Sequence, residues 1–302
     1  MKLLITGALG KDESFFDELR NCGHEIVYAE DERTPLTEQQ VEAAEIEGVI
    51  CNGLFLYNDI AKFTALRWIH LTSVGFDRVP LQYIKDHAIT LHNARGVYSI
   101  PMAEFAVSGV LQLYKGANYF YQNQARHTWE KKRDLLELFG KTVCIVGCGN
   151  VGTECARRFS AFGCTVNGID LYPTENTAFR EIRGLTFLED ALSASDIVVL
   201  TLPLSESTEH LMDERRLSVM KQGSVLVNIA RGKIVDTAAL ERALQKNLRG
   251  AVLDVFEEEP LAQNSPLWDM KNVIVTPHNS FVGEGNIKRL QKLILEDLYE
   301  KL

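Results

Sequence analysis

The sequence predicts an α/β protein whose strands form doubly wound parallel sheets. Short apolar runs alternate with longer stretches of helical spacing along the whole chain. Most of these runs are continuously apolar, which is typical of parallel strands covered by helices on both faces. The 302 residues are enough for two domains of ordinary size. We therefore expect two layered α/β domains.

Ten strands are predicted where apolar runs are bounded by polar or glycine-containing stretches. The first run is too short for the apolar core of a signal peptide and is better interpreted as a strand. In chain order, the predicted strands are Leu3–Thr6, Glu25–Tyr28, Gly48–Cys51, Trp68–Leu71, Thr142–Val146, Thr165–Ile169, Ile197–Leu202, Ser224–Ile229, Ala251–Leu253 and Val273–Thr276.

Two stretches divide the chain. The first, HNARGVYSIP at 92–101, is punctuated by glycine and proline, and the second lies near Pro277. The last predicted helix covers roughly 286–302 and has apolar residues at helical spacing, namely Ile287, Leu290, Ile294 and Leu298. If this helix returns to the first domain, the chain crosses between domains twice. The predicted domains are therefore 1–97 with 279–302, and 98–278.

Composition excludes several classes of function. The formal net charge of −9 repels nucleic-acid phosphates and anionic lipid, so neither is an expected partner. No apolar run approaches the length of a membrane span. The six cysteines form no CxxC pair and no metal-ligand spacing with histidine, so no metal site is predicted. Reduced cysteines and a cytoplasmic location are expected.

A strand, a glycine loop and a helix follow one another in TVCIVGCGNVGTECARRF, which begins at Thr142. The three glycines alone are a weak pattern, but their position between strand and helix makes it more specific. Gly147 permits a tight turn, Gly149 lets the backbone approach a pyrophosphate, and Gly152 lets the helix pack on the strand. The first N–H groups of the helix attract phosphate. A dinucleotide site is therefore predicted, and the alternative is a turn that only packs a helix.

Asp170 is predicted to select NAD. It ends the next strand, 18 residues after Gly152, where a carboxylate accepts hydrogen bonds from ribose hydroxyls. The same charge repels the 2′-phosphate of NADP, and Leu171 and Tyr172 supply no arginine to reverse the preference. NAD is therefore the expected cofactor and NADP is less favoured. The alternative is an incidental aspartate at a strand end.

Polar residues follow three further predicted strands. Arg231 follows the strand in SVLVNIARGKIVD, and His278 follows the strand in NVIVTPHNS. Between them, Asp254 and Glu259 follow the strand in GAVLDVFEEEPL. Because ligands of open parallel sheets bind outside the carboxyl ends of strands, we predict that Arg231, Glu259 and His278 converge beside a nicotinamide. Taken singly, each is more commonly a solvated loop residue, and Asp254 is alternatively a buried cap.

Seven segments match one family in order: TSVGFDRVP, ARGVYSIPMAEFA, LFGKTVCIVGCGNVG, LTLPLSESTEHLM, NIARGKIVDTAAL, AVLDVFEEEPL and VIVTPHNS. On these segments the chain resembles the D-isomer-specific 2-hydroxyacid dehydrogenase family over nearly its whole length. The resemblance implies two Rossmann-like domains, with the NAD-binding domain inserted into a discontinuous substrate domain and the ligand cleft between them. It also implies NAD-dependent, reversible reduction of a 2-keto acid to a D-2-hydroxy acid.

By this resemblance, His278 is the general acid–base, Glu259 hydrogen-bonds it, and Arg231 binds the substrate. The chemistry needs these residue types. Reduction of a 2-keto acid requires a proton donor that titrates near neutral pH, as imidazole does, and a neighbouring carboxylate favours the protonated imidazolium. Arginine offers a carboxylate two parallel donors, which lysine does not.

The resemblance also implies the contact residues. Those expected at the cofactor are Gly147, Gly149, Asn150, Val151, Gly152, Asp170, Leu202, Pro203, Thr208, Ile229, Ala230, Arg231, Asp254, His278 and Ser280. Those expected at the substrate are Asn52, Gly53, Val74, Gly75, Arg231 and His278, with the backbone N–H groups of Val74 and Gly75 on the substrate carboxylate. Many relatives have small or apolar residues where this chain has Asn279-Ser280-Phe281, which leaves the substrate preference open.

An unphosphorylated substrate is expected, because the residues after Gly53, LFLY, carry no positive charge for a phosphate. Phosphoglycerate, hydroxypyruvate or phosphite dehydrogenation on the same fold remains an alternative. Formate oxidation is disfavoured because formate enzymes have glutamine where this chain has Glu259. A nucleotide-sensing scaffold or corepressor without turnover is the alternative from another class. A homodimer through the NAD-binding domain is expected from the family, and the apolar helix at 101–114 suits that contact. Arg126 and Trp129 either reach a partner's site or serve packing.

Overall fold

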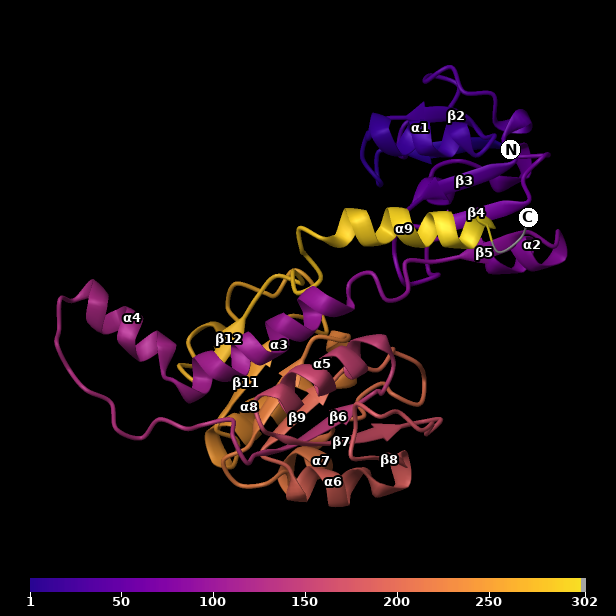
Figure 1. Ribbon diagram of the computed structural model, residues 1–302. Coiled ribbons are helices and arrows are strands. Elements are labelled where there is room, and N and C mark those ends of the chain that lie inside the picture. Colours follow the sequence, from indigo (N-terminus) through magenta and orange to yellow (C-terminus); the bar gives the residue numbers. More distant parts are fainter. Residues whose placement is uncertain (300–302) are drawn as a thin grey trace. The chain divides into compact units, whose positions relative to one another are not determined.

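The computed structural model describes residues 1–299, which divide into two compact units (Figure 1). The first unit is Met1–Val97 together with the segment that begins at Gly283, and the second is Tyr98–Val282. Each contains one parallel sheet with helices beside it, which confirms the predicted α/β fold class. The second division therefore follows Val282, four residues beyond the position that the sequence predicts.

The first unit has a five-stranded sheet in the order β2-β1-β3-β4-β5, and all neighbouring strands are parallel. The strands are β1 Lys2–Thr6, β2 Glu25–Ala29, β3 Gly48–Cys51, β4 Trp68–Leu71 and β5 Thr90–His92. Every residue of β3 and β4 is buried, as continuous apolar runs predict. The sequence did not predict β5, because this strand has only three residues, all half-buried, and no apolar run.

Three helices accompany this sheet: α1 Glu13–Asn21, α2 Leu81–Asp86 and α9 Asn286–Tyr299. Along α9, Leu290, Ile294 and Leu298 are buried, as their spacing predicts, whereas Ile287 in the first turn is exposed. The rest of the predicted last helix, 300–302, lies outside the described residues. Two side chains tie α9 to this unit: Gln291 donates to Asp12 Oδ2 (2.9 Å), and Arg289 Nε donates to the Val97 carbonyl (2.8 Å).

The second unit has a seven-stranded parallel sheet in the order β12-β11-β10-β9-β6-β7-β8. Its strands are β6 Thr142–Val146, β7 Thr165–Asp170, β8 Glu181–Gly184, β9 Ile197–Leu200, β10 Val225–Asn228, β11 Gly250–Leu253 and β12 Val273–Val275. Only β8 was not predicted. It lies at the edge of the sheet, where Glu181 and Arg183 are exposed, so it lacks an apolar run.

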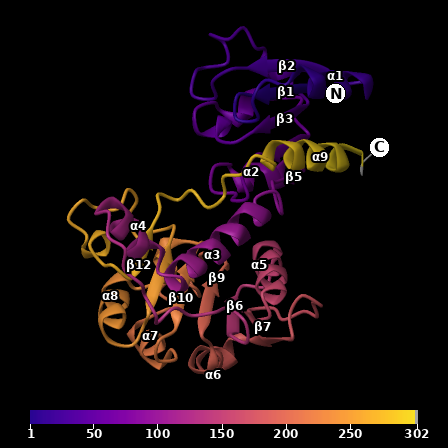
Figure 2. The same cartoon turned by 60° about the vertical axis from the view of Figure 1, so that its left-hand side comes forward.

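Helices cover both faces of this second sheet. The α-helices of this unit are α3 Ser99–Tyr114, α4 Ala117–Ala125, α5 Asn150–Ala161, α6 Leu188–Ala194, α7 Glu214–Val219 and α8 Thr237–Lys246. Side chains alternate along β6, so that Val143 and Ile145 pack with α3 and α5, whereas Cys144 and Val146 pack with α6, α7 and α8. Figure 2 shows α5 on one side of the strands and α6 and α7 on the other.

The helix α4 and the segment after it, 126–137, form an arm that extends away from the sheet in Figure 1. The side chain of Trp129 on this arm is 97% exposed. All six cysteines are unpaired. Within residues 1–299, no helix has both the length and the apolar character needed to cross a bilayer.

Candidate active site

Three neighbouring strands bring the predicted catalytic residues to one edge of the seven-stranded sheet. Because β10, β11 and β12 are adjacent and parallel, their carboxyl ends meet there. Arg231 follows the end of β10 by three residues, and His278 follows the end of β12 by three residues. Asp254 comes directly after β11, and Glu259 lies on the loop that continues from it.

His278 and Glu259 are joined by a hydrogen bond. His278 Nδ1 lies 2.8 Å from Glu259 Oε2, and the other carboxylate oxygen accepts the N–H of Phe256 (3.0 Å). Both side chains are accessible, with exposed fractions of 42% and 37%. With Nδ1 bound to the carboxylate, Nε2 is the ring nitrogen that can exchange a proton with a bound molecule. This is the arrangement that a general acid–base needs.

Asp254 holds the backbone on which His278 sits. Its buried carboxylate accepts hydrogen bonds from the N–H of Asn279 (2.8 Å), the N–H of Ser280 (2.9 Å) and the hydroxyl of Thr276 (2.6 Å). The carbonyl of Asp254 also accepts the N–H of His278 (2.8 Å). These bonds explain why residues 279–282 stay with the second unit. His278 itself has a φ of 52°, a left-handed conformation that non-glycine residues seldom adopt.

The Arg231 turn packs directly against the loop that carries Glu259. A side chain at Gly232 would overlap the carbonyl of Phe256, so only glycine permits this approach. Asn228 closes the turn, because its side chain donates to the Arg231 carbonyl (3.0 Å) and accepts the N–H of Ala230 (3.1 Å). The guanidinium of Arg231 is solvent-exposed, and Nη1 donates to the carbonyl of Ala230 (2.7 Å).

The three glycines of the loop differ in what surrounds them. Gly147 has a φ of 100°, and a side chain there would overlap the backbone of Leu202. A side chain at Gly152 would overlap the carbonyl of Gly147. At Gly149 nothing lies within 4 Å of that position, and α5 begins at the next residue, Asn150. An open backbone at the start of a long helix fits a pyrophosphate, so these residues are suited to a dinucleotide.

Asp170 is tied to the same loop. Its carboxylate accepts the N–H of Cys148 (2.6 Å) through Oδ2 and the N–H of Tyr172 (2.9 Å) through Oδ1. Each oxygen keeps a further lone pair for a hydroxyl. Burial, with the charge of Asp170 adding to it, raises the pKa of the Cys148 thiol to about 12. The thiol is therefore not a nucleophile at neutral pH.

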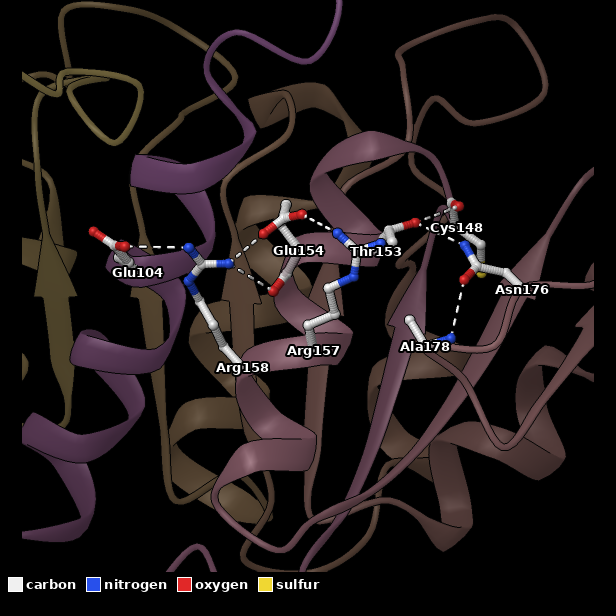
Figure 3. Close-up of polar contacts among 8 residues, drawn as sticks. All are labelled: Glu104, Cys148, Thr153, Glu154, Arg157, Arg158, Asn176 and Ala178. Carbon is white, nitrogen blue, oxygen red and sulfur yellow. Dashed lines mark hydrogen bonds and ion pairs between the residues drawn. The ribbon is translucent and has the colours of Figure 1, made fainter. Parts of the chain in front are cut away.

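Side chains on α5 fix the loops on either side of the helix (Figure 3). Thr153 donates to the Cys148 carbonyl (3.4 Å) and accepts from Asn176 (2.9 Å), whose own side chain accepts the N–H of Ala178 (3.0 Å). At the other end of the view, Arg158 bridges Glu154 of its own helix and Glu104 of α3 (3.2 Å). The glycine loop is thus attached to the segment after β7.

The remaining predicted cofactor residues lie in the first turn of α5 or in the segments that follow β9, β10 and β12. Thr208 is buried and closes the segment after β9, because its hydroxyl donates to the Pro203 carbonyl (2.8 Å) and accepts the N–H of Ser205 (2.7 Å). Val151 lies in the first turn of α5. Leu202, Ile229, Ala230 and Ser280 are buried.

The predicted substrate residues of the first unit follow β3 and β4. Glu32 accepts the N–H groups of Asn52 and Gly53, one on each carboxylate oxygen and both at 2.6 Å, together with the hydroxyl of Thr6 (2.5 Å). The backbone donors at Asn52 and Gly53 are therefore already engaged. Val74 is exposed.

Arg78 lies beside Gly53. Its side-chain Cδ is 3.9 Å from the position that a Cβ on Gly53 would take, and the guanidinium side chain is exposed. Arg78 directly follows SVGFD at 73–77. It was overlooked in the sequence because positive charge was considered only at residues 54–57. No sequence pattern pointed to Glu32, because its contact with Asn52, 20 residues away, exists only in the folded chain.

Comparison with known proteins identifies the family. Residues 107–280 match the family model described as "D-isomer specific 2-hydroxyacid dehydrogenase, NAD binding domain". The (S)-sulfolactate dehydrogenase of Chromohalobacter salexigens is 33% identical over 246 residues, which are 80% of this chain and 80% of that protein. The glyoxylate reductase of Korarchaeum cryptofilum is 32% identical over 241 residues, covering 77% of this chain and 72% of that protein.

A solved structure agrees with these relatives. The D-lactate dehydrogenase from Aquifex aeolicus, complexed with NAD and lactic acid, is 27% identical and has a TM-score of 0.74, with 99% of this chain and 94% of that chain covered. The family model alone spans more than half of the chain. The chain therefore belongs to the D-isomer-specific 2-hydroxyacid dehydrogenase family and is an NAD-binding oxidoreductase.

Proposed function

We propose that this protein catalyses the reversible, NAD-dependent reduction of a small, unphosphorylated 2-keto acid to the D-2-hydroxy acid. The observation that carries the proposal is the 2.8 Å bond between His278 Nδ1 and Glu259 Oε2, at the strand edge where the Arg231 turn packs. An imidazole held by a carboxylate and an exposed guanidinium are the groups that this reduction requires.

His278 gives its Nε2 proton to the carbonyl oxygen of the substrate, and in oxidation it takes the proton back. Glu259 stabilises the imidazolium and fixes which nitrogen faces the substrate. Arg231 binds the substrate carboxylate and stabilises the negative charge that develops on oxygen. The nicotinamide, when bound, supplies or accepts the hydride at carbon 2.

Residues 98–282 are proposed as the NAD-binding domain. The loop of Gly147, Gly149 and Gly152 and the start of α5 hold the pyrophosphate, and Asp170 accepts the ribose hydroxyls. NAD is favoured over NADP because the exposed Leu171 and Tyr172 bring no positive charge to a 2′-phosphate. The other proposed contacts are Asn150, Val151, Leu202, Pro203, Thr208, Ile229, Ala230, Arg231, Asp254, His278 and Ser280.

Residues 1–97, together with the segment that begins at Gly283, are proposed as the substrate domain. The N–H groups of Val74 and Gly75 bind the substrate carboxylate, and Asn52 and Gly53 form a further wall. Glu32 supports an unphosphorylated substrate, because its carboxylate occupies the N–H groups of Asn52 and Gly53 and repels a phosphate there.

Arg78 favours a second candidate, a 2-keto acid with a second anionic group. Its side chain lies beside Gly53, and a named relative acts on sulfolactate, which carries a sulfonate. Replacing Arg78 with methionine decides between the two. For the second candidate, kcat/KM for a sulfonated or dicarboxylic 2-keto acid falls at least about tenfold and kcat/KM for a monocarboxylic one is unchanged. If the substitution changes kcat/KM for neither class of substrate, the first candidate, a monocarboxylic 2-keto acid, is supported.

A homodimer through the NAD-binding domain is also proposed. The arm formed by α4 and 126–137 supports it, because a hollow of about 830 Å³ lined by Phe120 and Trp129 lies beside α4. An exposed tryptophan in the wall of a hollow suits an interface, because its ring offers a large apolar surface to a partner. The unpaired cysteines favour a cytoplasmic location.

The proposed activity is tested by following NADH or NADPH absorbance with a panel of 2-keto acids. The panel contains glyoxylate, hydroxypyruvate, phenylpyruvate, 2-ketoisocaproate, sulfopyruvate and phosphohydroxypyruvate. Turnover of an unphosphorylated acid with NADH supports the proposal, and a clear preference for phosphohydroxypyruvate overturns the substrate class. Binding of NADH without turnover of any acid identifies a nucleotide-sensing scaffold instead.

A further inference from the structure

Glu257 differs from its acidic neighbours in the direction of its side chain. Glu258 and Glu259 are exposed, whereas Glu257 is half-buried and its carboxylate binds two groups of the same unit. One oxygen accepts the backbone N–H of Thr237, the first residue of α8 (2.8 Å), and the other lies 2.9 Å from His210 Nε2. Neither His210 nor Glu257 was singled out in the sequence.

The backbone beside Glu257 touches both halves of the candidate site. The N–H of Phe256 donates to Glu259 Oε1 (3.0 Å), which aims the other oxygen at His278. The carbonyl of Phe256 and the N–H of Glu257 lie against Gly232, next to Arg231. The peptide between Phe256 and Glu257 therefore fixes the Arg231 turn on one side and the Glu259 carboxylate on the other.

His210 is itself fixed by the segment after Arg231. Its N–H donates to the Lys233 carbonyl (2.7 Å), and two residues later the N–H of Met212 donates to the Ile234 carbonyl (2.9 Å). His210 has a left-handed φ of 47°, a conformation that non-glycine residues seldom adopt. The imidazole thus connects the segment after β9 to the loop after β11.

Charge strengthens this connection. The hydrogen bond to Glu257 raises the pKa of His210, and the negative charges of Glu257, Asp236 and Glu209 act in the same direction. Burial alone would raise the pKa of Glu257, but the hydrogen bonds from Thr237 and His210 outweigh it and lower the pKa. Lys233 contacts His210 through its backbone carbonyl.

We propose that His210 and Glu257 are a positioning pair for hydride and proton transfer, holding the Phe256–Glu257 peptide so that Arg231, Glu259 and His278 keep their mutual geometry. The expected effect on kcat rests on the proposed function. The expected effect on the position of His278 rests on the contacts alone. Neither residue touches substrate or cofactor in this role.

The kinetic test replaces His210 with phenylalanine and Glu257 with leucine, because neither new side chain can form the hydrogen bond. We expect kcat to fall about tenfold in both, because a small displacement of a catalytic group costs one to two orders of magnitude. The dissociation constant for NADH is expected to stay within about twofold of wild type, since the glycine loop is unaffected. Glu258→Leu is the matched control, because it makes the same change at the adjacent exposed residue, and we expect it to keep wild-type kcat.

His210→Gln provides the conservative variant. A glutamine amide donates to Glu257 without a charge, so most of kcat is expected to return at neutral pH. Residue 210 no longer titrates in this variant. Its pH profile of kcat is therefore expected to report only the ionisation of the proposed acid–base, His278. If phenylalanine and glutamine at 210 give equal kcat and equal pH profiles, the positioning role is wrong.

A second measurement does not need turnover. Diethyl pyrocarbonate carbethoxylates imidazoles, and peptide mass spectrometry reports the rate at His278. A His278 released from Glu259 reacts faster, so we expect a rate increase of at least about threefold in Glu257→Leu and none in Glu258→Leu. An unchanged rate at His278 overturns the proposal even if no 2-keto acid is reduced, whereas a raised rate without turnover keeps the pair and removes only the proposed reaction.

Discussion

Asp254 accepts the backbone N–H of Ser280 at 2.9 Å, and it does so from a completely buried position at the end of β11. The same carboxylate binds the N–H of Asn279 and the hydroxyl of Thr276. The whole turn on which His278 sits is therefore organised by one buried anion. Two of its donors are backbone groups that have no strand partner to replace it.

Replacing Asp254 with alanine is expected to lower the free energy of unfolding by roughly 3 kcal/mol, because buried N–H groups lose their acceptor. Asparagine is expected to lower the free energy of unfolding by less, since its carbonyl oxygen can still accept some of these hydrogen bonds. Urea denaturation of both variants measures the loss. The exposed Asp269→Asn serves as control, and an alanine variant as stable as this control would contradict the anchoring role.

Gly149 and Gly152 are expected to respond differently to alanine. Gly149→Ala has open space and keeps the thermal midpoint of the protein, but it weakens NADH binding about tenfold or more because the new methyl group meets the pyrophosphate. Gly152→Ala forces its methyl group onto the Gly147 carbonyl and lowers the midpoint. Calorimetry and NADH fluorescence separate the two effects. Equal loss of stability in both variants would contradict this division.

Asp170→Asn is expected to reduce the preference for NAD. The amide keeps the shape of the side chain but removes the charge that repels a 2′-phosphate. We expect kcat/KM with NADH to fall about tenfold and kcat/KM with NADPH to rise, which steady-state kinetics with both cofactors measures. Asp196→Asn, which changes a carboxylate that directly precedes β9 and is bound to Lys221, is the control and is expected to leave the ratio unchanged.

His70 is expected to make the first unit sensitive to acid. Its ring is fully buried on β4 and parallel to that of His92, with centroids 6.1 Å apart, and both rings lie against Asp297 (3.1 and 3.2 Å). One carboxylate neutralises only one imidazolium, and His70 is the more deeply buried of the two rings. Burial, with His92 adding to it, lowers the pKa of His70 to about 4.

The sign of this effect follows from the two states. The unfolded chain binds a proton at His70 below about pH 6.5, whereas the folded chain binds it only near pH 4. Stability is therefore complete above about pH 6.5 and falls by roughly 3 kcal/mol as the pH decreases to 4. Urea denaturation across this range measures the loss. His70→Phe is expected to reduce it, and the exposed His87→Asn is expected to retain it; the same acid loss in both variants would contradict the assignment.

The sequence predicted the fold class and the central strands because these strands are buried on both faces and form continuous apolar runs. It missed β5 and β8, where short length or edge position removes that signal. The strand-end rule also put Arg231 and His278 at one edge, because parallel neighbours have their carboxyl ends together. It did not find Glu32 or the pair of His210 and Glu257. Their contacts join residues 20 to 47 positions apart, which no local pattern encodes.

At position 278, the residue that best suits the left-handed backbone differs from the residue that the proposed chemistry needs. Holding a non-glycine residue at this φ of 52° costs on the order of 1 kcal/mol of stability, a cost that glycine avoids. A randomised library at this codon, sorted only for soluble expression or heat resistance, would therefore enrich glycine and asparagine and discard the imidazole. Because His278 is the proposed acid–base, the same library sorted for turnover is expected to return histidine, so that the two selections disagree at this codon.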